Sequence, residues 1–382
     1  MQSRPRRVLI VSASIGYGHN QAAKAIACKL STQPQMQVNI VDFMADEISY
    51  LNSLIKETYF KMLALSPNVY DLLYRWTQAS AEGEQVANLL AAVMKKRMEK
   101  LIVEYKPDLV VCTHPFPCGA AAYLKKNRKV KTKLAAVITD YALHQLWIYK
   151  EVDLYFVGDV ELKCSLQKHS ILGSKIIVTG IPISSSFSQI NNDCTIMSDL
   201  KLSNNLPTIL IMGGGLGLGG VRETLESLEA IPKLLQILVV TGENRSLRQG
   251  LTVHAATSKH KIHIFGFTKQ IAELMISSDL LITKPGALTI SEALAMKLPM
   301  VFFQPIPGQE RDNAAHITQK GAAVLVETSA QLKNSVERLI SHPSEIQSMK
   351  ARAAMLSKPR AVDDIAAELC STLVGYNIAG NI

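Results

Sequence analysis

Short apolar runs alternate with helical patterns along the whole chain. The first run, Val8–Ser12, is followed by a turn that contains glycine and by a helical stretch over residues 21–30. Runs of the same kind recur in both halves of the chain, at Val38–Val41, Leu109–Cys112, Leu134–Thr139, Thr208–Met212, Ile237–Val240, His263–Phe265, Leu280–Thr283 and Met300–Phe303. This repeated order of strand, turn and helix predicts parallel sheets with helices on both faces.

The strand–helix series runs twice, which predicts two domains. Residues 184–207, between the two series, are rich in Ser and Asn and poor in helical or strand periodicity, so we expect a linker there. The predicted fold is α/β, with two Rossmann-like parallel-sheet domains, over residues 1–183 and 208–358, that face each other across a cleft. Open α/β sheets bind ligands at the carboxyl ends of their strands, so the cleft is the expected site.

One stretch, residues 48–76, breaks this alternation. Its apolar positions follow helical spacing, and residues 50–76 hold six aromatic side chains, among them Tyr59, Phe60 and Trp76. Basic residues are interleaved with these rings. Two interpretations remain open: a pair of helices packed on the sheet, or an element whose aromatic rings lie at the depth of lipid headgroups.

The chain has 382 residues and a net charge of +9, and nearly all of the excess lies in its first half. Residues 1–182 hold 23 Lys and Arg against 15 Asp and Glu, whereas residues 183–382 hold 18 against 17. We therefore expect the first half to meet an anionic partner, either a membrane surface or a nucleic acid. The six cysteines form no CxxC pair, and no apolar run is long enough for a membrane helix or a signal peptide, so we expect a cytoplasmic location.

A glycine-rich turn, GGGLGLGG over Gly213–Gly220, follows the strand Thr208–Met212. Glycines let backbone amides approach a phosphate, and the helix that follows adds partial positive charge. Gly215, Gly217 and Gly220 also fit the G-x-G-x-x-G spacing, with Glu243 about 20 residues further on, which is the fingerprint of a dinucleotide-binding oxidoreductase. A purely structural tight turn is the third interpretation.

Two further motifs follow strands in the second half. In TKPGALTISEAL, Gly286 makes the turn into a helix, Thr289 can bind a phosphate, and Glu292 lies one helical turn along, where a carboxylate can bind ribose hydroxyls. PIPGQERDNA then concentrates three hydrogen-bonding side chains of the kind that sugars need, Gln309, Glu310 and Asn313. The structural alternatives are a capped corner and a polar loop.

Together these motifs resemble those of glycosyltransferase family 28, and within it those of the bacterial diacylglycerol glucosyltransferases and plant monogalactosyldiacylglycerol synthases. GYGHNQAAKAI, TDYALHQLW and VTGIPI in the first half resemble further motifs of these enzymes, so the resemblance covers almost the whole chain. It implies the GT-B fold, a UDP-sugar donor, inversion at the anomeric carbon and no bound metal or cofactor. It also implies that the last helix, within residues 359–382, packs back towards the N-terminal domain.

The resemblance assigns roles to single residues on the donor side. It implies that Glu292 binds ribose, and that Gly266 and Phe267 form the turn whose backbone contacts uracil. It places Gln309 and Glu310 at the sugar, with Asn313 beside them. The residues expected at the diphosphate and the departing UDP are Gly213, Gly214, Gly215, Gly286, Thr289 and Lys284.

On the acceptor side, His19 is the expected general base, since an imidazole with a pKa near 6.5 suits that role at neutral pH. Asp140 is expected to orient His19 or to be the base itself. Gly18 belongs to the same motif as His19, and His144 and Trp147 are expected in the acceptor pocket or in packing.

The predicted function is transfer of a hexose, glucose or galactose, from UDP-glucose or UDP-galactose to the hydroxyl of 1,2-diacylglycerol. The expected place is the inner face of the cell membrane, where basic residues such as Arg4, Arg6 and Arg7 would dock on anionic lipid without any nucleic acid partner. The alternatives are transfer to a prenyl-linked murein precursor, a UDP-sugar 2-epimerase, a UDP-sugar sensor without catalysis, and an NAD oxidoreductase.

Overall fold

The computed structural model describes residues 4–14, 17–44, 81–188, 196–215, 217, 220–306 and 308–375. They form two compact units. Unit 1 comprises Met1–Ser184 and Pro359–Ile382, and unit 2 comprises Ser185–Lys358. The aromatic stretch 48–76, with Tyr59, Phe60 and Trp76, lies outside the described residues.

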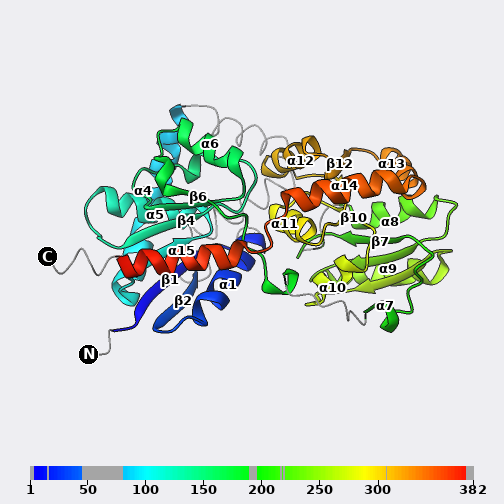
Figure 1. The fold of residues 1–382 in the computed structure, drawn as a ribbon, viewed down its shortest axis with the longest axis horizontal. Coiled ribbons are helices and arrows are strands. Elements are labelled where there is room, and N and C mark those ends of the chain that lie inside the picture. The colour runs from blue at the N-terminus through cyan, green and yellow to red at the C-terminus, as the bar shows by residue number, and fades with distance from the viewer. Residues whose placement is uncertain are drawn as a thin grey trace. The chain divides into compact units, whose positions relative to one another are not determined.

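Unit 1 is built on a six-stranded parallel sheet of order β2-β1-β3-β4-β5-β6 (Figure 1). Its strands are β1 (Arg6–Ser12), β2 (Met36–Asp42), β3 (Leu109–Cys112), β4 (Lys133–Val137), β5 (Leu154–Val157) and β6 (Ile176–Val178). Its α-helices are α1 (Tyr17–Ser31), α4 (Ala81–Tyr105), α5 (Pro115–Lys126), α6 (Val160–Lys168) and α15 (Ala361–Gly375), with short 3-10 turns η1 (Gln145–Trp147) and η2 (Gly173–Lys175).

The alternation of side chains along β1 explains how this sheet is covered on both faces. Val8 and Ile10 pack in one core with α1 and α15, whereas Leu9 and Val11 pack in a second core with α4 and α5. Both faces of a parallel strand are therefore buried, which is why its sequence is a continuous apolar run.

Unit 2 repeats the design with a parallel sheet of order β12-β11-β10-β7-β8-β9 (Figure 1). Its strands are β7 (Thr208–Met212), β8 (Gln236–Val240), β9 (Lys261–Phe265), β10 (Leu280–Thr283), β11 (Met300–Phe303) and β12 (Ala323–Val326). Its helices are η3 (Ser185–Phe187), α7 (Ile196–Asp199), α8 (Val221–Glu229), α9 (Arg245–Thr257), α10 (Ile271–Ile276), α11 (Ala287–Ala295), α12 (Gln309–Gln319), α13 (Ser329–Ser341) and α14 (Pro343–Leu356).

The predicted fold class is confirmed: two parallel sheets, each flanked by helices. The sequence analysis missed three short strands of three or four residues, β5, β6 and β12. Part of the expected linker is tied to unit 2, since the Gln236 side chain accepts from Ser203 N at 2.6 Å and donates to Ser203 O at 2.9 Å.

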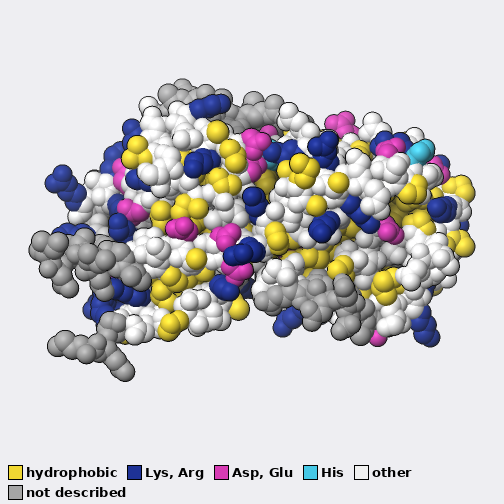
Figure 2. All heavy atoms as spheres, viewed as in Figure 1, with side chains coloured by type: hydrophobic (Ala, Val, Ile, Leu, Met, Phe, Trp, Pro, Cys, Tyr) yellow, Lys and Arg dark blue, Asp and Glu magenta, His cyan; other side chains and the backbone are white. Residues whose placement is uncertain are grey.

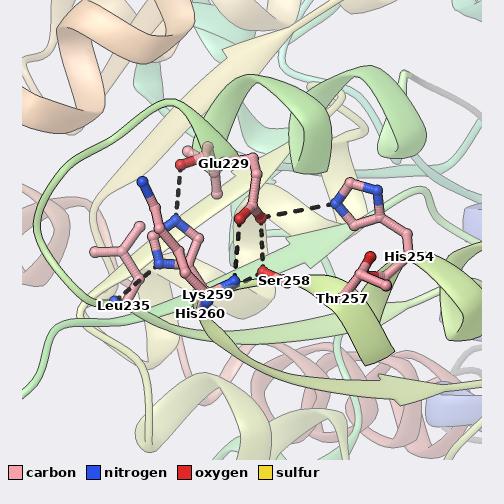
Figure 3. Close-up of polar contacts among 8 residues, drawn as sticks. Glu229, Leu235, His254, Thr257, Ser258, Lys259 and His260 are labelled. Carbon is pink, nitrogen blue, oxygen red and sulfur yellow. Dashed lines mark hydrogen bonds and ion pairs between the residues drawn. The ribbon is translucent and has the colours of Figure 1, made fainter.

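A polar cluster fixes the turn between α9 and β9 onto the end of α8 (Figure 3). The Glu229 carboxylate accepts from the Ser258 hydroxyl at 2.6 Å and from Lys259 N at 3.1 Å. His260 accepts from Leu235 N at 3.3 Å, and its other ring nitrogen lies 2.9 Å from the carbonyl of Leu228. These bonds satisfy the buried polar groups of the turn, so the cluster has a structural explanation.

The basic residues at the start of the chain are partly engaged within unit 1. Arg4 forms an ion pair with Asp108 at 2.6 Å, and Arg6 and Arg7 are half-buried in β1. In the described ranges, no helix has both the length and the apolar content needed to span a membrane.

Candidate functional site

Three neighbouring strands of unit 1 bring His19 together with two threonines. His19 lies in the first turn of α1, after β1, while Thr113 follows β3 and Thr139 follows β4. The His19 Nδ1 lies 3.0 Å from the Thr113 carbonyl oxygen and 2.6 Å from the Thr139 hydroxyl oxygen. The site therefore forms at the carboxyl ends of parallel strands, where ligands of open α/β sheets bind.

These contacts determine which ring nitrogen of His19 carries the proton. A carbonyl oxygen only accepts, so Nδ1 donates to Thr113, and the Thr139 hydroxyl can donate to the same carbonyl at 3.3 Å. Nε2 is then the nitrogen with a lone pair. Burial lowers the pKa of His19 to about 4, although the bond to Thr113 acts in the opposite direction. The ring is neutral at pH 7 and can accept a proton.

A second imidazole, His114, packs against His19. The ring centroids are 4.7 Å apart and the planes meet at 75°. His114 caps α5, since its Nδ1 accepts from Phe116 N at 3.2 Å. Its pKa is held well below the usual value, first by burial and then by the nearby charge that His19 would carry when protonated.

The other residues expected on the acceptor side have different surroundings. Gly18 precedes His19 in α1, and Asp140 is a buried residue that directly follows Thr139. The His19 ring is in contact with Thr113 and Thr139, two residues to which the sequence analysis gave no role. The sequence signal that could have indicated them is a threonine directly after a buried strand.

His144 and Trp147 are held in the interior of unit 1. His144 caps η1 by accepting from Leu146 N at 3.2 Å, and burial lowers its pKa to about 4. The Trp147 side chain is 1% exposed and belongs to the core between the sheet, α4 and α5. The Trp147 indole therefore packs within this core.

In unit 2, the glycine-rich turn after β7 lies directly on the turn after β8. A Cβ atom on Gly242 would stand 2.3 Å from the Gly215 carbonyl oxygen, and one on Gly217 would stand 2.4 Å from the Thr241 carbonyl oxygen. Both residues also have positive φ, +59° and +63°. Close packing of two backbones therefore explains Gly217, so the G-x-G-x-x-G spacing does not by itself indicate a dinucleotide.

Lys284 connects the three motifs that the sequence places far apart. Its ammonium pairs with Glu310, and its side chain lies beside Gly214 and Gly286. The second Glu310 oxygen accepts from Ile306 N at 3.0 Å. The structure thus brings the glycine turn, the start of α11 and the start of α12 to one place, with a mostly buried cation at its centre. Gly213 connects β7 to this turn, and Gln309 is the first residue of α12.

The remaining residues expected on the donor side lie within α11 and α12. Thr289 and Glu292 are half-buried in the first two turns of α11, and burial raises the pKa of Glu292 to about 8. Asn313 is buried, and its side-chain amide donates to the Pro285 carbonyl at 3.4 Å. Asn313 therefore holds the turn before α11, and Glu310 binds Lys284, which are structural contacts that the sugar-binding hypothesis did not include.

A pocket of about 500 Å³ opens at the ends of β8 and β9. It includes the turn expected at uracil, with Phe267 55% exposed. Its lining is Gly242, Glu243, Arg245, Arg248, Gly266 and Phe267. The two arginines, on the first turn of α9, were not predicted. Guanidinium groups with an exposed aromatic ring suit a nucleotide, whose phosphates are anionic and whose base is flat.

Comparison with known proteins matches one family model to the first part of the chain and another to the second. Residues 19–183 match the family model of monogalactosyldiacylglycerol (MGDG) synthase, and residues 208–366 match that of the glycosyltransferase family 28 C-terminal domain. Processive diacylglycerol beta-glucosyltransferases of Bacillus thuringiensis (strain Al Hakam) and Bacillus anthracis (strain A0248) are 32% identical over 360 residues, 94% of this chain and 92% of each relative.

Solved structures share the fold at low sequence identity. Acinetobacter baumannii MurG is 17% identical with a TM-score of 0.62, covering 96% of this chain and all of that one. The S. aureus MnaA–UDP structure is 11% identical with a TM-score of 0.62, covering 96% and 97%. At these identities the likeness concerns the fold alone.

Proposed function

This chain belongs to the family 28 glycosyltransferases, in the group of the diacylglycerol glucosyltransferases, and we propose that it transfers glucose from UDP-glucose to the free hydroxyl of 1,2-diacylglycerol. The observation that carries the proposal is the half-buried, uncharged His19, whose Nδ1 proton is bound by Thr113 and Thr139 and whose Nε2 is left to act as a base. The relatives named above support the choice of sugar and acceptor.

In the proposed reaction, His19 Nε2 takes the proton of the acceptor hydroxyl as its oxygen attacks the anomeric carbon. The bond from that carbon to the β-phosphate oxygen breaks, and UDP leaves with the bonding electrons. Inversion converts the α-linked donor into a β-glucoside. A base of this kind accelerates a reaction by roughly 10²- to 10⁴-fold.

Unit 2 supplies the groups that suit the donor. Lys284 and the N-terminus of α11 offer positive charge to a diphosphate, which develops further charge as UDP departs. The pocket lined by Arg245, Arg248 and Phe267 is large enough for the nucleoside. Glu292, with a raised pKa, lies on α11 beyond the diphosphate residues, as a ribose ligand would.

The outer face of α4 supports action at the inner face of the cell membrane. Leu89, Val93 and Val103 are 66%, 48% and 66% exposed, and Lys96 and Lys100 are exposed between them at helical spacing. Figure 2 shows Lys and Arg side chains along the left edge of unit 1. Apolar and basic side chains on one face of a helix favour an anionic lipid surface.

The test is transfer of radiolabel from UDP-glucose, and separately from UDP-galactose, to diacylglycerol in vesicles with and without anionic lipid. We expect a labelled chloroform-soluble product from UDP-glucose, stimulated by anionic lipid and reduced at least about 100-fold in His19→Ala. His169→Ala, at an exposed position after α6, is the matched control and should keep full activity.

Other outcomes would redirect the proposal. Product that persists in His19→Ala would transfer the role of base to Asp140. Label from UDP-galactose alone would replace glucose by galactose. Binding of UDP without any lipid product would contradict the diacylglycerol acceptor and favour the murein precursor or the epimerase.

A further inference from the structure

His19 and His114 present opposite tautomers side by side. Nδ1 of His19 donates to the Thr113 carbonyl, so its Nε2 has a lone pair. Nδ1 of His114 accepts from Phe116 N, so in the neutral ring its Nε2 carries the proton. The outer nitrogens of the two rings are therefore one acceptor and one donor.

A hydroxyl group needs this combination of partners. It donates one hydrogen and accepts through its oxygen. Two nitrogens that bind the same oxygen, each at about 2.9 Å, lie about 5 Å apart. The ring centroids of His19 and His114, 4.7 Å apart, permit this spacing.

We propose that His114 is a second catalytic residue, whose Nε2–H donates to the acceptor hydroxyl oxygen while His19 takes the proton of that hydroxyl. The inference rests on the proposed function, because it concerns the same hydroxyl acceptor. One lone pair of the oxygen accepts from His114 and the other forms the bond to the anomeric carbon. The proton moves to His19 Nε2, and His114 keeps its own proton throughout.

The surroundings of His114 fit this role better than a structural one alone. Capping of α5 uses only Nδ1, and Asn, Asp or Ser would cap the helix as well or better. The His114 ring also packs against two aromatic rings: its centroid lies 4.9 Å from that of Phe116 and 4.7 Å from that of His19. Burial, and the charge that His19 gains during the reaction, keep His114 neutral and fix it as a donor.

Two substitutions separate the proposed donor from the helix cap. In His114→Asn, the side-chain oxygen takes the place of Nδ1 and keeps the cap, but the donor at the Nε2 position is lost. In His114→Gln, the side-chain amide reaches the Nε2 position and can donate, but the cap is lost. Structural and catalytic roles therefore predict opposite rankings of the two variants.

We expect His114→Asn to keep its melting temperature and its KM for UDP-glucose, while kcat/KM for diacylglycerol falls roughly 10- to 100-fold. His114→Gln should be less stable but more active than His114→Asn. Activity that follows stability, with Asn above Gln, would overturn the inference, as would a wild-type kcat/KM in His114→Asn. If the wild-type protein transfers no sugar to diacylglycerol while it binds UDP, the proposed function fails first.

Discussion

At the scale of single residues, burial places two titratable groups far from their ordinary pKa values. His19 is neutral because its enclosed ring loses the hydration that an imidazolium needs, and two oxygens then select its tautomer. Burial acts on Glu292 in the opposite direction and favours the protonated carboxyl. One physical cause therefore keeps the His19 imidazole neutral below pH 7 and keeps the proton on the Glu292 carboxyl above pH 7.

The first prediction concerns the pH dependence of transfer. In the proposed mechanism His19 accepts a proton only when it is neutral, so activity should be lost as pH falls through its pKa. With that pKa at about 4, kcat/KM for diacylglycerol should be level from pH 8 to about 5 and fall near pH 4. Initial rates on vesicles from pH 3.5 to 8 measure the profile, and an acid limb near 6.5, the value for an exposed histidine, would contradict it.

The second prediction concerns Glu292 and stability. A carboxyl whose pKa rises from 4.5 when unfolded to about 8 when folded binds its proton more tightly in the folded state. Stability is therefore lost as pH rises from 4.5 to 8, and the loss is complete above 8. Glu292→Gln should match the wild type near pH 5 and melt several degrees higher at pH 9. Melting curves without nucleotide at the two pH values test this, and a parallel pH dependence of both proteins would contradict it.

At the scale of elements, the two turns that follow β7 and β8 pack directly against each other. Gly242 approaches Gly215 so closely that no side chain fits between them, and Gly217 approaches Thr241 in the same way. The glycines of the first turn are thus needed for backbone packing, whether or not they also contact a phosphate. Lys284 and Glu310 connect the starts of α11 and α12 to these two turns, because the two side chains pair and Lys284 lies beside Gly214.

The third prediction follows from that packing. Gly242→Ala adds a Cβ atom 2.3 Å from a backbone oxygen at φ +59°, so we expect a loss of about 2–4 kcal/mol in unfolding free energy and weaker UDP binding. Gly250→Ala is the matched control. Its Cβ would meet only the mobile end of Arg222, and alanine is favoured over glycine inside α9 by about 1 kcal/mol. Denaturant unfolding and UDP titration of both variants test this. Equal stability and equal UDP affinity of the two variants would contradict the prediction.

At the scale of the whole molecule, the last helix of the chain completes the core of the first unit. In α15, Val362, Ile365 and Leu369 are buried with Ile26 and Leu30 of α1. Lys29 of α1 also pairs with Asp363 at 2.5 Å. Unit 1 therefore acquires one face of its core only when residues from the far end of the chain are in place.

The fourth prediction tests this dependence. Leu369→Ala removes a fully buried side chain and should lower the unfolding free energy of unit 1 by about 2–5 kcal/mol, whereas Glu368→Ala, on the exposed face, should change little. Calorimetry with and without UDP distinguishes the units, because nucleotide stabilises the one that binds it. A shift confined to the UDP-sensitive transition would contradict the assignment.

The sequence by itself determined the fold class and the positions of most strands, because buried parallel strands must be apolar runs and each is closed by a turn before its helix. It also placed His19, Lys284, Gly286 and Glu292 after strand ends, where a ligand site forms. These are local properties, written in consecutive residues, and the resemblance to known enzymes was read from the same segments.

Only the tertiary structure decided which distant residues meet. Thr113 and Thr139 orient His19 because β3 and β4 lie next to one another beside β1, and no spacing along the chain reveals that. Glu310 binds Lys284, and Trp147 is buried, for the same reason: strand order and packing set the partners. Burial decides the charge of His19 and Glu292, and the fold decides which side chains are buried.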